Sequence, residues 1–159
     1  MDKVCFIITP IGKEGTEIRK NADEVLEYII NPVCDSFGYS VVRADKMTNS
    51  GLITKAIIEQ IISADLVIAD LTGSNPNVFY ELAIRHSYRK PAIQIIKGDV
   101  NIPFDIANMR TISYETTLSG ADLARACLKI KNCTKHVFLS PFHDRIKKKG
   151  AFICQDVMN

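Results

Sequence analysis

Short apolar runs alternate with amphipathic stretches along most of this sequence. Apolar, β-branched runs occupy residues 4–9, 39–44, 66–69, 91–96 and 110–114, and they predict short buried strands. Apolar positions at three- and four-residue spacing over residues 16–37 and 53–63 predict amphipathic helices. Two further helices are expected, one beginning near Pro76 and one over residues 119–131. Pro32 is expected to kink the first helix, because proline removes a hydrogen bond and clashes with the preceding turn.

Regular alternation of strands and helices is typical of a parallel sheet with helices on both faces. The predicted fold is therefore an α/β, three-layer sandwich with a doubly wound, mainly parallel sheet of about five strands, of the flavodoxin-like kind. Residues 1–135 are expected to form this domain. Residues 136–159, with the basic run 145–149, are expected to be a C-terminal tail that packs on the domain or leads to a missing region.

Three polar loops follow the first three predicted strands, over Thr9–Gly12, Asp45–Gly51 and Asp70–Asn77. Because the carboxyl ends of parallel strands share one edge of a sheet, these loops should converge on one crevice. In the last loop, Asn75 can cap a helix and Pro76 suits its first position. Glu81 would then lie in the second turn of that helix, beside the crevice.

Composition narrows the possible classes. The chain has 159 residues, 47% of them hydrophobic and 24% charged, which fits one globular domain. We find neither an apolar run of membrane-spanning length nor a leader-like segment, so a cytoplasmic protein without membrane contact is expected. Five cysteines without a CxxC pair and three scattered histidines predict reduced thiols and no metal site. The net charge of +2 does not favour nucleic acid, and no cofactor is expected.

Candidate chemistry gathers in the crevice. Glu81 and Asp70 are two carboxylates expected at one cleft, an arrangement that is costly unless a ligand or proton uses it. The sequence contains no GxGxxG and no GxxxxGK[ST] motif, so dinucleotide and phosphate-loop fingerprints are absent. Small polar groups of the three loops suit sugar hydroxyls and a single phosphate. The predicted substrate-binding residues are Thr9, Ile11, Gly12, Asp45, Ser50, Gly51, Thr72, Asn75, Asn77 and Tyr80.

Three segments also carry a family resemblance. Residues 64–72, 75–83 and 90–92 resemble the nucleoside 2-deoxyribosyltransferases and their nucleotide N-glycosidase relatives, and the likeness extends over most of residues 4 to 96. The chain is also similar to bacterial Toll/interleukin-1 receptor-like domains, some of which cleave NAD. The resemblance implies that Glu81 attacks or stabilises the anomeric carbon of a nucleoside, nucleotide or NAD-like substrate. It implies further that Asp70 orients the sugar, that Tyr80 matches a tyrosine of the nucleotide-cleaving relatives, and that the protein is a homo-oligomer.

Two positions depart from the family pattern. The place of the family's acid that handles the proton on the base falls at about Ile57, with Glu59 as the closest acid. The family's Glu-Leu-Gly is replaced by Glu81-Leu82-Ala83. Simple hydrolysis, or binding without turnover, is therefore expected more than base exchange. The alternative function is a non-catalytic Toll-like module that senses a nucleotide signal or assembles, for example in antiphage defence. A third is a nucleotide-binding domain of a longer protein.

Overall fold

Five strands form one parallel sheet in the computed structural model, which describes residues 3–47, 53–98, 102–103, 106, 109–115 and 120–139. The sheet order is β2-β1-β3-β4-β5, and each neighbouring pair is parallel. The strands are β1 (Lys3–Ile8), β2 (Tyr39–Arg43), β3 (Leu66–Asp70), β4 (Ala92–Lys97) and β5 (Thr111–Tyr114). The predicted parallel sheet is confirmed. Its direction of winding reverses between β1 and β3, which is where open α/β sheets form their ligand crevice.

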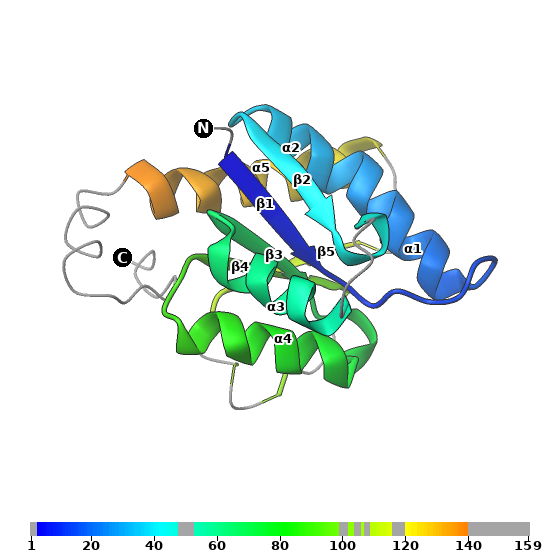
Figure 1. Ribbon diagram of the computed structural model, residues 1–159. Helices are drawn as coiled ribbons and strands as arrows, with labels where there is room; N and C mark the ends of the chain where they lie inside the picture. The colour runs from blue at the N-terminus through cyan, green and yellow to red at the C-terminus, as the bar shows by residue number, and fades with distance from the viewer. Residues whose placement is uncertain are drawn as a thin grey trace.

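Helices cover both faces of the sheet (Figure 1). One face carries α1 (Glu17–Val25), η1 (Leu26–Ile30), α2 (Asn31–Asp35) and α5 (Gly120–Leu139). The other face carries α3 (Ile53–Ser63) and α4 (Pro76–Ser87). Short 3-10 turns, η2 (Ala44–Lys46) and η3 (Thr72–Ser74), follow β2 and β3. The predicted three-layer sandwich is confirmed.

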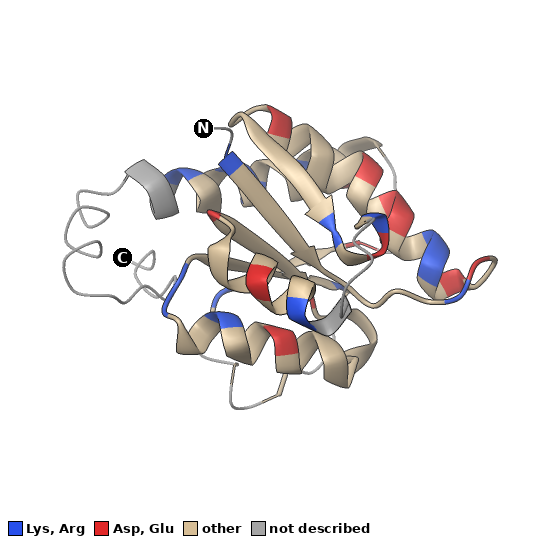
Figure 2. Ribbon diagram, viewed as in Figure 1, with Lys and Arg blue, Asp and Glu red and all other residues tan. Residues whose placement is uncertain are grey.

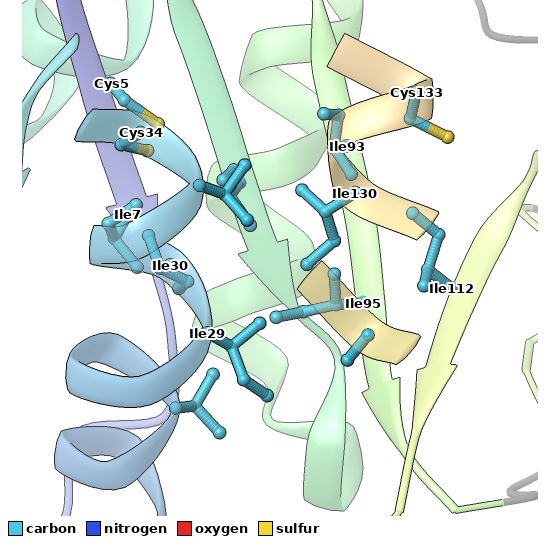
Figure 3. Packing of buried hydrophobic residues seen from close by; sticks show 14 of the residues in the cluster. Cys5, Ile7, Ile29, Ile30, Cys34, Ile93, Ile95, Ile112, Ile130 and Cys133 are labelled. Carbon is cyan, nitrogen blue, oxygen red and sulfur yellow. The ribbon is translucent and has the colours of Figure 1, made fainter. Parts of the chain in front are cut away.

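Alternate side chains of the strands build two separate cores. In β1, Cys5 and Ile7 belong to the core cluster on the side of η1, α2 and α5, where Figure 3 shows them next to Cys34 and Ile30. Phe6 and Ile8 belong to the cluster on the side of α3 and α4. All five residues of β3 are buried, as expected for a central strand that is covered on both faces. Lysine, arginine, aspartate and glutamate lie mainly on the helices and loops (Figure 2).

The first helical segment is interrupted, as Pro32 predicts, but the irregularity lies in the turn before the proline. Residues Leu26–Ile30 form a π-helical turn, closed by a hydrogen bond from the Asn31 N–H to the Leu26 carbonyl. Pro32 follows in the first turn of α2. Because proline has no N–H and its ring crowds the carbonyl four residues earlier, a wider turn at this point keeps the chain helical without a clash.

The last helix is longer than the sequence pattern predicts. We expected it to end near Lys131, but α5 continues to Leu139, with Cys133 and Thr134 buried. The Thr134 hydroxyl donates to the Ile130 carbonyl 2.9 Å away, so a polar residue lies in the helix without an unpaired group. The helix thus crosses the boundary drawn at residue 135. Residues 140–159 lie outside the described part, and the separate tail stays a prediction.

Candidate functional site

A cavity of about 370 Å³ opens at the carboxyl edge of the sheet, between the start of α1 and the loop that joins β3 to α4. Three predicted substrate-binding residues, Thr9, Thr72 and Asn75, line it. Four more lining residues, Pro10, Gly73, Ser74 and Pro76, belong to the loops that were predicted to form the crevice. The residues that were not predicted to line it are Glu17, Ile18, Asn21 and Lys97. The cavity therefore combines hydroxyl, amide, carboxylate and ammonium groups with an apolar side chain and two prolines.

The loop after β3 turns sharply to start α4. Gly73 and Ser74 have positive φ angles of 74° and 51°, in the left-handed region that a side chain rarely adopts. The Asn75 side chain then accepts a hydrogen bond from the Asn77 N–H at 2.9 Å, and Pro76 is the first helical residue. The predicted helix start is confirmed, and its cap belongs to the cavity wall.

Asp70 lies beneath the cavity, with 1% of its surface exposed. Its Oδ1 accepts hydrogen bonds from the Thr72 backbone N–H, at 3.0 Å, and from the Thr72 hydroxyl. Its Oδ2 accepts one from the Tyr114 hydroxyl at 2.9 Å. Burial raises the pKa of the Asp70 carboxyl above its ordinary value, while these hydrogen bonds oppose the rise. Asp70 does not line the cavity, so any effect on a ligand there passes through Thr72.

Tyr114 joins the cavity floor to the far strand of the sheet, and sequence reasoning missed it. Its hydroxyl oxygen lies 2.9 Å from the Asp70 Oδ2, 3.0 Å from the Thr72 hydroxyl and 3.2 Å from the Asn21 Nδ2. The Lys97 backbone N–H donates to the Thr72 hydroxyl at 2.9 Å. Thr72 and Asn21, which line the cavity, are therefore both held by buried partners.

Thr9 stands out among the lining residues because its hydroxyl is buried without a hydrogen-bond partner among the described residues. The residue is 9% exposed and follows the end of β1 directly. A buried hydroxyl without a partner is unfavourable, and such groups in native structures call for a specific explanation.

Asp45, a predicted substrate-binding residue, takes part in an ion-pair network and does not line this cavity. Arg43 is 1% exposed and donates to both Asp45 oxygens, at 2.6 and 2.8 Å, and to Asp23 at 2.5 Å. Arg19 lies 2.9 Å from Asp45. The two arginines hold the pKa of the Asp45 carboxyl below its ordinary value against the effect of burial. The carboxylate therefore fixes α1 to the end of β2.

The β1–α1 loop approaches the start of α1 closely at Gly12. A Cβ atom on Gly12 would lie 2.5 Å from the Thr16 hydroxyl and 2.9 Å from the Ile18 Cβ. Thr16 is the N-cap of α1 and accepts from the Arg19 N–H. Gly12 thus allows the loop to pack on the capped helix end. Ile11 is exposed, and neither Ile11 nor Gly12 lines the cavity.

Glu81 lies on α4, one turn from the buried residues Val78 and Arg85. Its side chain is half-buried, and burial raises the pKa of its carboxyl. Glu81 does not line the cavity described above, nor do Asn77 and Tyr80, and Tyr80 is 63% exposed. The remaining predicted positions, Ser50 and Gly51, lie outside the described residues.

Two searches of the described ranges bear on other kinds of site. No group of three or more histidine, cysteine, aspartate or glutamate residues there could hold a metal ion. No helix of the described chain combines the length and the apolar character needed to cross a membrane.

Known proteins share the fold of this chain. The CMP N-glycosidase of Clostridium botulinum aligns with a TM-score of 0.53 and 17% identity, over 79% of this chain and 99% of its own. A 2-deoxyribosyltransferase from Bacillus psychrosaccharolyticus gives a TM-score of 0.52 and 14% identity, over 81% of this chain and 90% of its own. The shared feature is the fold.

A third structure, a 2-deoxyribosyltransferase from Leishmania mexicana, gives a TM-score of 0.46 and 15% identity. The alignment covers 59% of this chain, and this chain spans 64% of the length of that protein. No family profile and no curated protein matches the sequence.

Proposed function

We propose that this protein cleaves the N-glycosidic bond of a nucleoside or nucleotide, with Glu81 as the carboxylate that acts on the anomeric carbon. Two structures of similar fold with TM-scores above 0.5 are named for N-glycosidic chemistry, one a CMP N-glycosidase and the other a 2-deoxyribosyltransferase. Because a fold hosts many functions, this likeness supports the proposal only together with the chemistry of the chain's own residues.

The environment of Glu81 is the observation that carries the proposal. The carboxyl is half-buried in the second turn of α4, whose first residue and cap line the cavity. No ion pair or hydrogen bond to Glu81 is found within the described residues. Burying a carboxylate without a cationic partner is costly, and perturbed groups of this kind gather at functional sites.

The chemistry requires Glu81 in its ionised form. As the bond between the anomeric carbon and the base nitrogen breaks, its electron pair leaves with the base and positive charge develops on the sugar. The Glu81 carboxylate either stabilises this charge or forms an ester bond to the anomeric carbon. Water then attacks the anomeric carbon, its oxygen becomes the sugar hydroxyl, and its proton balances the charge of the departed base.

The other candidate residues take supporting roles in this proposal. Asp70 orients the sugar through Thr72, whose hydroxyl it holds. Asn75 and Asn77 lie at the start of α4, where the positive end of the helix dipole favours a sugar or phosphate oxygen. Tyr80 and the loop residues Ile11, Gly12, Ser50 and Gly51 complete the proposed crevice, and a second subunit of a homo-oligomer would close it.

The test follows the release of free base from deoxynucleosides, nucleoside monophosphates and NAD. We expect the wild type to release base from at least one of them, and Glu81→Gln to lower the rate by at least about 100-fold, since the amide cannot act as the carboxylate does. Glu27→Gln is the matched control, because Glu27 is an exposed glutamate of η1 that does not line the cavity. Release that is unchanged in Glu81→Gln would overturn the catalytic assignment.

One observation favours the alternative, a nucleotide-sensing module without turnover. Ile57 packs against the core formed with α3 and α4, in the place where the transferases carry an acid for the leaving base. If no substrate releases base while a nucleotide binds tightly by calorimetry, the sensing function replaces the enzymatic one.

A further inference from the structure

Two cavity residues on α1, Glu17 and Asn21, have no role in the proposed bond cleavage. They are four residues apart on the same helix, and both line the cavity. Residues with this spacing lie on one face of a helix, about 5–6 Å apart between Cβ atoms. Glu17 is exposed and forms no ion pair with any described residue. Its carboxylate is therefore available as a hydrogen-bond acceptor for a ligand.

The buried network below the cavity decides which end of the Asn21 amide faces the ligand. The Tyr114 hydroxyl donates its one hydrogen to the Asp70 Oδ2, 2.9 Å away. Toward Asn21 the same hydroxyl must then accept, and the Asn21 Nδ2 donates to it at 3.2 Å. With the amino end of the amide held in this way, its oxygen is left for the cavity. The α1 wall therefore presents two acceptors side by side.

The groups around these acceptors have different chemistry. Lys97, at the end of β4, supplies a cationic donor to the cavity lining. Thr9 contributes the buried hydroxyl to which no described residue offers a hydrogen bond. Ile18, Pro10 and Pro76 provide apolar surface. A flat apolar ring with hydrogen-bond donors on one edge and an acceptor on another edge would match this arrangement.

We propose that the cavity binds a nucleobase that carries an exocyclic amino group, whose hydrogens are donated to the Asn21 Oδ1 and the Glu17 carboxylate. Cytosine, adenine and guanine carry such a group together with ring acceptors for Lys97. The volume of about 370 Å³ lies within the usual range for small-molecule sites. This inference rests on the proposed function, because it names the base of the same nucleoside or nucleotide substrate.

The site would distinguish amino-bearing bases from carbonyl-bearing ones through the base edge that faces α1. Uracil and hypoxanthine place a carbonyl oxygen where cytosine and adenine place the amino group. A carbonyl oxygen has no hydrogen to donate to the Asn21 Oδ1 or the Glu17 carboxylate. Both acceptors would then be shielded from water by the base and left without a hydrogen bond. The loss of a hydrogen bond to a charged group corresponds to an affinity at least about tenfold weaker.

The test compares matched nucleotides by isothermal titration calorimetry. CMP is compared with UMP, and AMP with IMP, on the full chain carrying Glu81→Gln to prevent turnover, with the wild type as a check. We expect one amino-bearing nucleotide to bind at least about tenfold more tightly than its carbonyl partner. Glu17→Gln should lower this ratio, since the new amide offers a donor as well as an acceptor, while the Asn21 oxygen keeps part of the preference. Glu27→Gln, at an exposed glutamate of η1 that does not line the cavity, should leave the ratio unchanged.

Tyr114→Phe tests the orienting role of the tyrosine separately from its role in packing. Without the hydroxyl, the Asn21 amide can turn over, so the affinity ratio should fall while the fold is retained by circular dichroism. A merely structural role would weaken both nucleotides of a pair equally and so overturn the assigned orientation. Equal binding of both partners in each pair would overturn the amino-base inference alone. Failure of every nucleotide to bind would overturn this inference together with the proposed function.

Discussion

Arg85 offers a direct test of how α3, α4 and the sheet are held together. The side chain is 0% exposed and comes from α4, near the end of the helix. Its guanidinium donates five hydrogen bonds to the carbonyls of four residues, Ile61, Ala64, Asp65 and Pro91. No carboxylate of the described residues forms an ion pair with it, and burial lowers the pKa of the guanidinium to about 10. Arg85→Met keeps a long apolar side chain and removes every donor.

The expected cost comes mainly from two carbonyls. The Ile61 and Ala64 oxygens lie 2.7 and 2.9 Å from the guanidinium, in the last turn of α3 and just after it. Helix-end carbonyls of this kind have no donor within their own helix. The Pro91 carbonyl retains the Val67 N–H, at 3.3 Å. At about 1–3 kcal/mol for each unsatisfied buried group, the two oxygens correspond to roughly 2–6 kcal/mol. Because the substitution also removes a buried charge, we expect a loss of about 2–4 kcal/mol.

The assay is urea unfolding followed by far-UV circular dichroism, with thermal unfolding as a second measurement. A loss of this size should lower the melting temperature by roughly 5–15 °C for a chain of this length. Arg125→Met is the matched control. Arg125 has 65% of its side chain exposed and a single ion pair with Asp122 at 3.6 Å, so its replacement should change stability by less than about 1 kcal/mol. If Arg85→Met unfolds with the same midpoint and slope as Arg125→Met, the carbonyl-capping explanation is wrong.

Three further predictions concern the proposed catalytic carboxylate Glu81, the β1–α1 loop and the ion-pair network of Asp45. Because burial raises the pKa of Glu81, the pKa read from the acid limb of the kcat/KM profile should lie above the ordinary glutamate value of 4.5. Stopped assays across pH 4–8 measure this limb, and an apparent pKa below 4.5 would contradict the prediction. Gly12→Ala should cost about 1–3 kcal/mol in urea unfolding, since its Cβ would overlap the Thr16 hydroxyl. Gly120→Ala is the control and should not destabilise, because a Cβ there would meet no atom of the described chain within 4 Å. Arg43 and Arg19 lower the pKa of Asp45 in the folded state. The stability that the Asp45 ion pairs contribute is therefore fully present above the unfolded-state pKa of 3.8, and it is lost as the pH falls through the folded-state pKa. Asp45→Asn should therefore be less stable at neutral pH and lose less stability on acidification below pH 4, and an unchanged acid slope would contradict the assignment.

The cavity shows where sequence reasoning reached the site and where it stopped. Thr9, Thr72 and Asn75 were predicted correctly as residues of one crevice, because each follows a strand and the carboxyl ends of parallel strands share an edge. Glu17, Asn21 and Lys97 were missed. Glu17 and Asn21 were assigned only to an amphipathic helix, and helical periodicity does not tell which polar residues of a helix face a cavity.

Local chemistry explains what the sequence by itself determined. The apolar runs predicted all five strands, because burial on both faces of a parallel sheet requires apolar residues at successive positions. Asn75 and Pro76 predicted the start of α4, because capping depends on neighbouring residues alone. Pro32 predicted an irregular turn for the same reason.

Contacts between distant segments decided the rest. Asn21 and Tyr114 are 93 positions apart, and their hydrogen bond exists only because the fold packs α1 and β5 into the same core cluster. Asp45 followed a strand just as Asp70 did, but the fold placed Arg43 and Arg19 against it, while Asp70 received hydroxyl partners from Thr72 and Tyr114. Carboxylates with the same sequence signal thus acquired different environments, because the neighbours of a side chain are set by the packing of the whole sheet.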